Sequence, residues 1–207
     1  MPTDPRKRQK KLEQKAARRK EKKHLIVRQS SVSLATRFSL AASCPVLHSC
    51  ISDSSWDMGI GQAYLTRLLP DGQVVVAIFL VDRYCLGVKS SIAEIVPRAT
   101  YNTRYAPGLP GGGKVTNHPP AAVRKYVEGA VAYAHDLGFA PDEDYAVARL
   151  VFGDIDASTA SETFEYGKNG KPFYISGPNE STARSREIIA TLDRKTAPGR
   201  SDYVVRL

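Results

Sequence analysis

Residues 74–81 are apolar without interruption, and this run constrains the fold more than any other feature of the chain. A second β-rich segment, 62–69, precedes it, and the two are joined by a turn that contains Asp71 and Gly72. Asp-Gly between two such segments is typical of a β-hairpin, because Gly readily adopts the positive φ that the turn needs. A strand that is apolar on both sides needs cover on both faces. We therefore expect 74–83 to lie in the middle of a sheet.

The remaining elements are expected in blocks. From 120 to 137 apolar residues recur at helical spacing, with Pro120 in the first turn and Gly138 after the last turn, which predicts a helix. The other expected elements are a strand at 46–51, a turn or brief helix at 53–61, a helix at 143–152, a hairpin at 163–176, a helix capped by Asn179 or Ser181 that ends near 194, and a strand at 203–207. Blocks of strands and helices favour an α+β fold, with a mixed or antiparallel sheet and helices packed on it.

Composition divides the chain into four segments. A basic arm covers 1–24, a strand-rich lobe with the central hairpin covers 25–106, and a loop rich in Gly and Pro covers 107–118. A second α+β lobe covers 119–207. A loop of this composition can separate two lobes, and the two lobes can equally form one domain.

The arm holds most of the net charge. Residues 1–24 contain eleven Lys or Arg and three Asp or Glu, a net charge of +8, whereas residues 25–207 contain nineteen and eighteen, a net charge of +1. The cationic residues of the arm are Arg6, Lys7, Arg8, Lys10, Lys11, Lys15, Arg18, Arg19, Lys20, Lys22 and Lys23. Such a distribution is typical of segments that bind a polyanion. Repulsion between like charges predicts a free arm that is disordered or a fraying helix, and a solubilising tail without a partner is the alternative.

The sequence predicts a soluble, cytoplasmic protein. It contains no apolar run of the roughly 20 residues that a membrane-spanning helix needs. The basic N-terminus is not followed by the apolar core and small-residue cleavage site of a secretory signal. Three cysteines cannot all pair in disulfides. The composition of the arm also suits a nuclear import signal.

Cys44, His48, Cys50 and Cys85 are the first candidates for chemistry. In a strand, His48 and Cys50 point to the same face, and Cys85 joins them if the end of its own strand lies nearby. Thiolates and imidazole suit zinc, and His48 can alternatively activate Cys50 or Cys85 as a nucleophile. The spacing matches no paired zinc knuckle, however, and cysteines are common in protein cores. No cofactor is therefore predicted, and zinc is the alternative.

Residues 108–115 match the spacing of a phosphate-binding P-loop, with Lys114 in the lysine position. Val115 replaces the hydroxyl residue that binds Mg²⁺, and no buried strand precedes the loop, so nucleotide hydrolysis is not predicted. Lys114 can still contact a phosphate backbone. Asp154 and Asp156 have the spacing of a shared divalent-metal site, but Asp is equally ordinary after a helix end.

A basic and aromatic cluster is expected at the tip of the hairpin 163–176. Lys168 and Lys171 flank Asn-Gly, and Phe173 and Tyr174 follow. Cations next to aromatic rings often hold single-stranded nucleic acid. The two rings point to opposite faces of a strand, so at most one can stack on a base. A solvated turn with one core aromatic is the plainer interpretation.

Two stretches, 79–89 and 170–178, resemble segments of an uncharacterised bacterial protein family to which no activity is assigned. The resemblance implies no mechanism and no role for any residue. Function has to be inferred from the residues themselves.

The charge of the arm favours a nucleic-acid-binding protein, with RNA as the favoured partner and ribosome association as one setting. Contacts between Lys or Arg and phosphate position a protein without reading sequence. The alternative is a hydrolase or metal-dependent enzyme that uses His48, Cys50, Cys85 or the pair Asp154 and Asp156. A third hypothesis is a protein-interaction module whose arm binds an acidic protein partner or a membrane surface, although the arm lacks the hydrophobic face that membrane binding favours.

Overall fold

The computed structural model describes residues 34–106, 113–178, 180–197 and 199–205. The chain divides into one unit of residues Met1–Arg37 and a second of residues Phe38–Leu207. Of the first unit, residues 34–37 are described, and they are helical. The prediction of a basic arm at 1–24, disordered or helical, lies outside the described residues.

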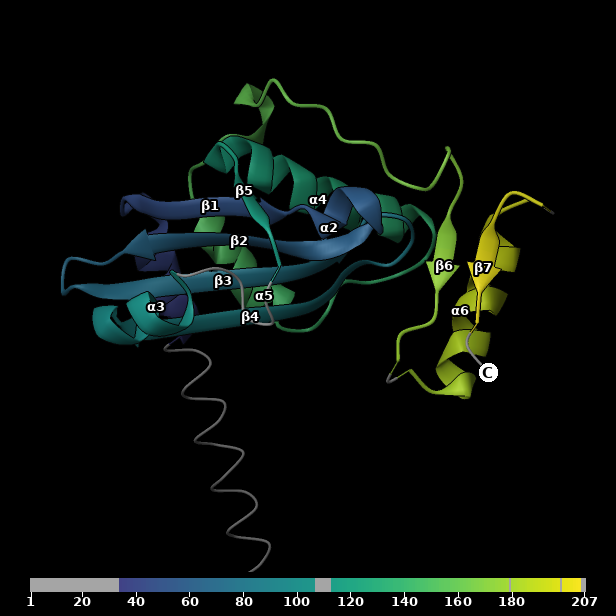
Figure 1. The fold of residues 1–207 in the computed structure, drawn as a ribbon, viewed down its shortest axis with the longest axis horizontal. Helices are drawn as coiled ribbons and strands as arrows, with labels where there is room; N and C mark the ends of the chain where they lie inside the picture. The colour runs from purple at the N-terminus through teal and green to yellow at the C-terminus, as the bar shows by residue number, and fades with distance from the viewer. Residues whose placement is uncertain (1–33, 107–112, 179, 198, 206–207) are drawn as a thin grey trace, which may run out of the picture. The chain divides into compact units, whose positions relative to one another are not determined.

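The main sheet of the second unit has five antiparallel strands (Figure 1). They are β1 (Val46–Ser52), β2 (Ile60–Leu68), β3 (Gln73–Asp82), β4 (Gly87–Pro97) and β5 (Val115–Asn117), in the spatial order β4-β3-β2-β1-β5. β3 has a partner strand on both sides, and its residues 74–79 are all buried. The prediction of a central strand is therefore confirmed.

The predicted hairpin between β2 and β3 is also confirmed. Leu68 pairs with Val74, and the Leu69 N–H donates to the carbonyl of Gln73 at 2.9 Å. Gly72 has a φ of +79°, so the turn uses the conformational freedom of glycine. β4 pairs with β3 along its whole length, although the sequence did not predict it, because Ser, Lys and Glu interrupt its apolar pattern.

Helices cover both faces of this sheet. The α-helices are α2 (Ser54–Asp57), α3 (Arg98–Arg104), α4 (Pro120–Asp136), α5 (Tyr145–Ala148) and α6 (Thr182–Lys195), and the 3-10 helices are η1 (Ala41–Ser43), η2 (Arg149–Phe152) and η3 (Ala157–Thr159). α4, α5 and η2 pack on one face, where the rings of Phe79 and Phe152 stack at 5.3 Å. α3 packs on the other face, where Tyr101 and Tyr105 join a buried cluster with Tyr64.

The C-terminal segment packs at the end of the sheet where β3 turns into β4 (Figure 1). β6 (Phe173–Ile175) and β7 (Asp202–Val204) form a parallel pair, and α6 lies beside them. Cys85 and Leu86 of the β3–β4 turn share a buried cluster with Leu192 of α6 and with the end of α4. This contact places α6 and β6 next to the β3–β4 turn, at the end of the sheet.

Two predicted elements differ from the structure. The helix expected at 143–152 is divided into the short helix α5 and the 3-10 helix η2, and Arg67 donates hydrogen bonds to the carbonyls of Val151 and Phe152 at the end of η2. The hairpin expected at 163–176 is reduced to one bridge between Lys168 and Lys171, because β6 pairs with β7 instead.

The predicted α+β class is confirmed, with an antiparallel main sheet. The last helix is confirmed as α6, and Ser181 is its cap, since its hydroxyl accepts a hydrogen bond from the Arg184 N–H at 3.2 Å. In the described part of the chain, no helix has the length and apolar character needed to cross a membrane.

Candidate ligand-binding cleft

His48 and Cys50 both contact the buried cluster around Tyr101, but they are not paired with each other. His48 Nδ1 shares a 2.5 Å hydrogen bond with the Tyr101 hydroxyl, and the two rings stack at 5.7 Å. Cys50 donates its S–H to Asn117 Oδ1 at 2.9 Å. Burial lowers the pKa of His48 and raises the pKa of Cys50, so both groups are neutral near pH 7. A buried neutral thiol is a poor nucleophile.

Cys85 belongs to a different cluster, with residues of α4 and α6, and burial raises the pKa of its thiol. Cys44 is half-buried. The condition under which Cys85 would join His48 and Cys50 is not met, because the turn that carries Cys85 packs against α6 rather than against β1. Across the residues that the structure describes, no three His, Cys, Asp or Glu side chains gather to hold a metal ion.

The other sequence candidates lie in separate places. Lys114 follows the glycine loop and forms a 3.3 Å ion pair with Asp53, and the chain then enters β5 rather than a helix. Asp154 is exposed and lies 3.9 Å from Arg67. The side chain of Asp156 instead caps η3. These carboxylates stabilise local structure, and the structure does not pair them around a metal site.

At the expected hairpin tip, both lysines are exposed but already engaged. Lys168 Nζ lies 4.3 Å from the centroid of the Phe173 ring, and Lys171 Nζ donates to the carbonyl of Gly199 at 3.2 Å. Tyr174 is fully buried. Tyr174 therefore cannot stack on a base, and one face of Phe173 is covered by an ammonium group.

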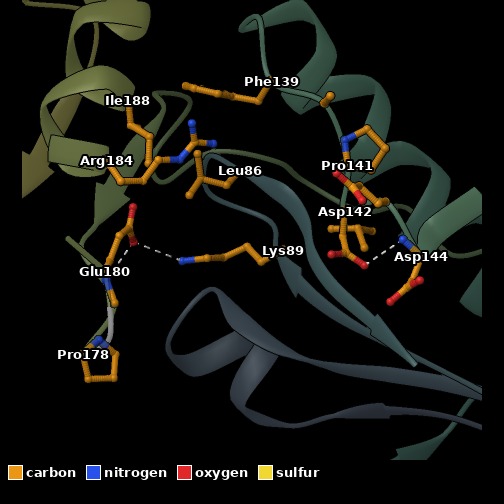
Figure 2. Close-up of a pocket in the computed structure, with 14 residues that line it drawn as sticks. Leu86, Lys89, Phe139, Pro141, Asp142, Asp144, Pro178, Glu180, Arg184 and Ile188 are labelled. Carbon is orange, nitrogen blue, oxygen red and sulfur yellow. Dashed lines mark hydrogen bonds and ion pairs between the residues drawn. The ribbon is translucent and has the colours of Figure 1, made fainter. Parts of the chain in front are cut away.

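A cleft of about 650 Å³ lies between β4, the loop after α4 and the start of α6 (Figure 2). It combines apolar walls, among them Leu86, Phe139 and Ile188, with charged groups on both sides. The charged residues that line it are Lys89, Asp142, Glu143, Asp144, Glu180 and Arg184. The loop after α4 supplies the three carboxylates Asp142, Glu143 and Asp144, and the opposite side carries Lys89 and Arg184 together with Glu180.

A smaller pocket of about 250 Å³ adjoins this cleft, and both are lined by Lys89, Gly177 and Pro178. Its walls are mainly apolar or aromatic, and one buried carboxylate contributes to its lining. The wall residues are Met58, Ile60, Tyr84, Phe173 and Ile175, and the carboxylate belongs to Asp82.

Lys89 stands between the two cavities and faces Glu180 (Figure 2). The Lys89 Nζ lies 3.7 Å from Glu180 Oε2, and both side chains are largely buried. Glu180 is held in place because its other oxygen accepts a hydrogen bond from the Tyr174 hydroxyl at 2.8 Å, while Oε2 accepts from the Gly177 N–H at 3.1 Å. A carboxylate with this many partners is a fixed anchor for the lysine.

Asp82 is 7% exposed and ends β3. Its Oδ1 accepts hydrogen bonds from the backbone N–H groups of Tyr84 and Cys85, at 3.0 and 3.1 Å. Burial raises the pKa of Asp82 to about 6, although Lys89 and the backbone N–H groups oppose the shift. The pocket is thus lined by a carboxyl group that titrates close to physiological pH, beside an ammonium group.

Comparison with protein families, with curated proteins and with solved structures finds no match. The cleft therefore has to be interpreted from its own residues.

Sequence reasoning missed Lys89 and Glu180 as parts of one site. They lie far apart along the chain and meet because α6 packs against the β3–β4 turn. The one available signal was a lysine inside a β-rich stretch next to several small and apolar residues. A pattern of this kind does not identify its partner.

Proposed function

We propose that the protein binds nucleic acid, with RNA as the favoured ligand, through its cationic N-terminal arm. The observation that carries this proposal is the partition of charge, +8 in residues 1–24 against +1 in residues 25–207. Lysine and arginine residues that neutralise phosphates release the counterions condensed on the nucleic acid, and this release supplies affinity without sequence preference.

The distribution of charge within the folded unit, whose net charge is −1, supports the same proposal. From 168 to 205 the described residues include seven Lys or Arg, all exposed, against four Asp or Glu. The seven are Lys168, Lys171, Arg184, Arg186, Arg194, Lys195 and Arg200. Residues 113–167 contain four Lys or Arg and nine Asp or Glu, a net charge of −5. A polyanion held by the arm is therefore attracted to the C-terminal segment and repelled by the segment before it.

The test is a filter-binding titration of the full-length chain with single-stranded RNA at several salt concentrations. If six to ten charges neutralise phosphates, the affinity falls by about 10³–10⁵ between 50 and 200 mM salt. A variant in which Lys7, Lys10, Lys11, Lys15, Lys20 and Lys22 are changed to Gln should bind more weakly, with a log–log salt slope smaller by about 4.

The matched control changes the same six lysines to Arg, which keeps the charge and should keep both the affinity and the salt slope. Equal, salt-insensitive binding by the Gln variant and the unmodified chain overturns the proposal. Tighter binding to single-stranded DNA of the same sequence than to RNA leaves nucleic-acid binding in place and overturns the preference for RNA.

The hydrolase alternative receives no support from the described residues. His48 is bonded to Tyr101 rather than to a thiol, and burial raises the pKa of both Cys50 and Cys85. We therefore do not propose a second function.

A further inference from the structure

Exposed apolar side chains converge on the smaller pocket. Among the described residues, five large apolar side chains are exposed, and two of them, Met58 at 59% and Ile175 at 39%, line this one cavity. They come from different parts of the chain, the end of α2 and the end of β6. Scattered apolar residues on a surface are ordinary, whereas apolar residues gathered around a cavity indicate a binding site.

The pocket has the size of a site for a single ring system. Its volume of about 250 Å³ lies below the roughly 300–1,000 Å³ of pockets that take drug-sized ligands. Two of its walls are aromatic: the rings of Tyr84 and Phe173 lie 6.4 Å apart and meet edge to face. Lys168 lies over the Phe173 ring, which places a cation at the same wall. Arg83 likewise lies over the Tyr84 ring, so both aromatic walls carry a cation, and such a mixed apolar and cationic lining suits a polarisable heterocycle.

The polar groups of the pocket form a donor and acceptor pair. The carboxyl group of Asp82 can accept a hydrogen bond, and the ammonium group of Lys89 can donate one. Asp82 is more than nine-tenths buried and Lys89 is held by Glu180, so neither group is a freely moving surface charge. Asp82 keeps acceptor capacity beyond the two backbone N–H groups that it binds, and Lys89 keeps N–H donors beyond the one that faces Glu180, so both can bond to a ligand edge.

We propose that this pocket binds one unstacked nucleobase of a single-stranded RNA. This inference rests on the proposed function and names the part of the ligand that the folded unit recognises. The base inserts between Met58, Tyr84 and Ile175, and the edge that carries its hydrogen-bonding groups faces Asp82 and Lys89.

Nucleobases match the pocket better than an aliphatic side chain does. Each of the four bases has an apolar, polarisable face and an edge that presents at least one N–H donor and one acceptor. The pocket therefore supplies affinity for a base rather than a strict choice among bases. Lys168, at the Phe173 ring, and Lys171, at the Gly199 carbonyl, place two exposed positive charges beside β6, which attract the phosphates next to the inserted base.

The experiment uses the full-length chain and a short single-stranded RNA that contains one 2-aminopurine, whose fluorescence changes when the base leaves its stack. Addition of the protein should change the fluorescence of 2-aminopurine. The double variant Met58→Ala, Ile175→Ala removes two walls and should weaken RNA binding by about 5- to 150-fold, if the two walls together contribute as much as one base-stacking aromatic side chain. It should also abolish the fluorescence change.

Matched controls use exposed apolar residues outside the pocket. Leu40 is 72% exposed and Tyr203 is 49% exposed, and neither lines the pocket. The double variant Leu40→Ala, Tyr203→Ala should bind RNA and change the fluorescence as the unmodified protein does. A second pocket variant, Lys89→Gln, tests the polar edge and should weaken binding of the normal RNA more than binding of an RNA with an abasic site.

The outcomes separate this inference from the proposed function. The pocket inference is overturned if both pocket variants bind RNA with unchanged, salt-dependent affinity and if normal RNA and RNA with abasic sites bind equally well. The proposed binding of RNA by the arm then still stands. Absence of salt-dependent RNA binding overturns the proposed function. If the pocket instead receives an apolar side chain of another protein, RNA binding is unchanged by the pocket variants, which also overturns the inference.

Discussion

Two polar clusters in the folded unit use similar residue types for different purposes. Around Tyr101, the side chains of His48, Thr66 and Cys50 are hydrogen-bonded inside a core. Around Lys89, acidic and aromatic side chains border two cavities. The first cluster contains histidine and cysteine, which are often reactive residues, whereas the second cluster borders cavities that a ligand can enter. A reactive residue type identifies a site only where a ligand can reach it.

The two clusters also differ in charge. In the Tyr101 cluster, burial shifts the pKa of His48 downward and that of Cys50 upward, so the groups remain neutral. In the Lys89 cluster an ion pair is retained, with Lys89 3.7 Å from Glu180. Neutral hydrogen-bonded groups mainly stabilise a fold, whereas charged groups at a cavity can change their state when a ligand binds.

The largest expected effect comes from truncation in the Tyr101 cluster. Tyr101→Ala removes a fully buried ring and its hydrogen bonds and should lower the free energy of unfolding by about 3–5 kcal/mol, measured by urea denaturation. The affinity of the remaining folded protein for RNA should stay unchanged. If the variant instead loses RNA affinity while its stability is unaltered, the RNA-binding site lies on the α3 face. That result contradicts the assignment of the Tyr101 cluster to the core.

The Lys89 cluster should control the pH dependence of stability. The pKa of Asp82 rises from 3.8 to about 6 on folding because of burial. The folded protein therefore holds this proton more tightly, so the associated stability is present below pH 3.8 and is lost as pH rises through 6. The shift corresponds to about 3 kcal/mol. Asp82→Asn cannot ionise, so its stability relative to the unmodified protein should increase by up to that amount between pH 4 and 8.

Urea titrations of both proteins at matched pH values measure this difference, and the subtraction removes the contribution of ionisable groups that do not interact with Asp82. If the difference in unfolding free energy between the two proteins is constant from pH 4 to 8, Asp82 has the same pKa in the folded protein as in the unfolded chain. In that case the carboxyl group is solvated, and the contrast between the two clusters disappears.

The same substitution in both clusters gives a direct comparison. Tyr174→Phe removes a hydrogen bond to the charged Glu180 and should cost about 1.5–3 kcal/mol. Tyr101→Phe removes hydrogen bonds to the neutral groups His48 and Thr66 and should cost about 0.5–1.5 kcal/mol. Chemical denaturation of the two variants measures both values. The reverse order contradicts the assignment of charge to the Lys89 cluster.

Local sequence patterns predicted the parts of the fold that depend on local chemistry. Gly72 in the β2–β3 turn, the uninterrupted apolar run of β3 and the helical spacing in α4 were sufficient for correct assignments. Each of these elements has one strong local determinant. By contrast, β4 has a mixed pattern and depends on its pairing with β3, so it was not predicted.

Long-range contacts account for the errors. At the end of η2, Arg67 of β2 binds the carbonyls of Val151 and Phe152, a contact that no pattern within 143–152 indicates. β6 pairs with β7 rather than within a hairpin. The candidate site depends on the same kind of contact, since Glu180 reaches Lys89 only after α6 has packed. No local sequence pattern predicts the contact between Lys89 and Glu180.

The smallest effect separates the role of Lys89 from that of its neighbours. Lys89 lowers the pKa of Asp82 against the effect of burial. Lys89→Met keeps the length of the apolar stem and removes the charge, so the pKa of Asp82 should rise above its value of about 6. The carboxyl chemical shift of Asp82, followed by NMR during a pH titration, measures the change.

Arg184→Met is the matched control. Arg184 lines the larger cavity and forms its ion pair with Glu187, so its removal should leave the pKa of Asp82 unchanged. If the pKa of Asp82 is unchanged in Lys89→Met, the ammonium group of Lys89 interacts with Glu180 and not with Asp82. The carboxyl group of Asp82 and the ammonium group of Lys89 then do not act as a pair in the smaller pocket.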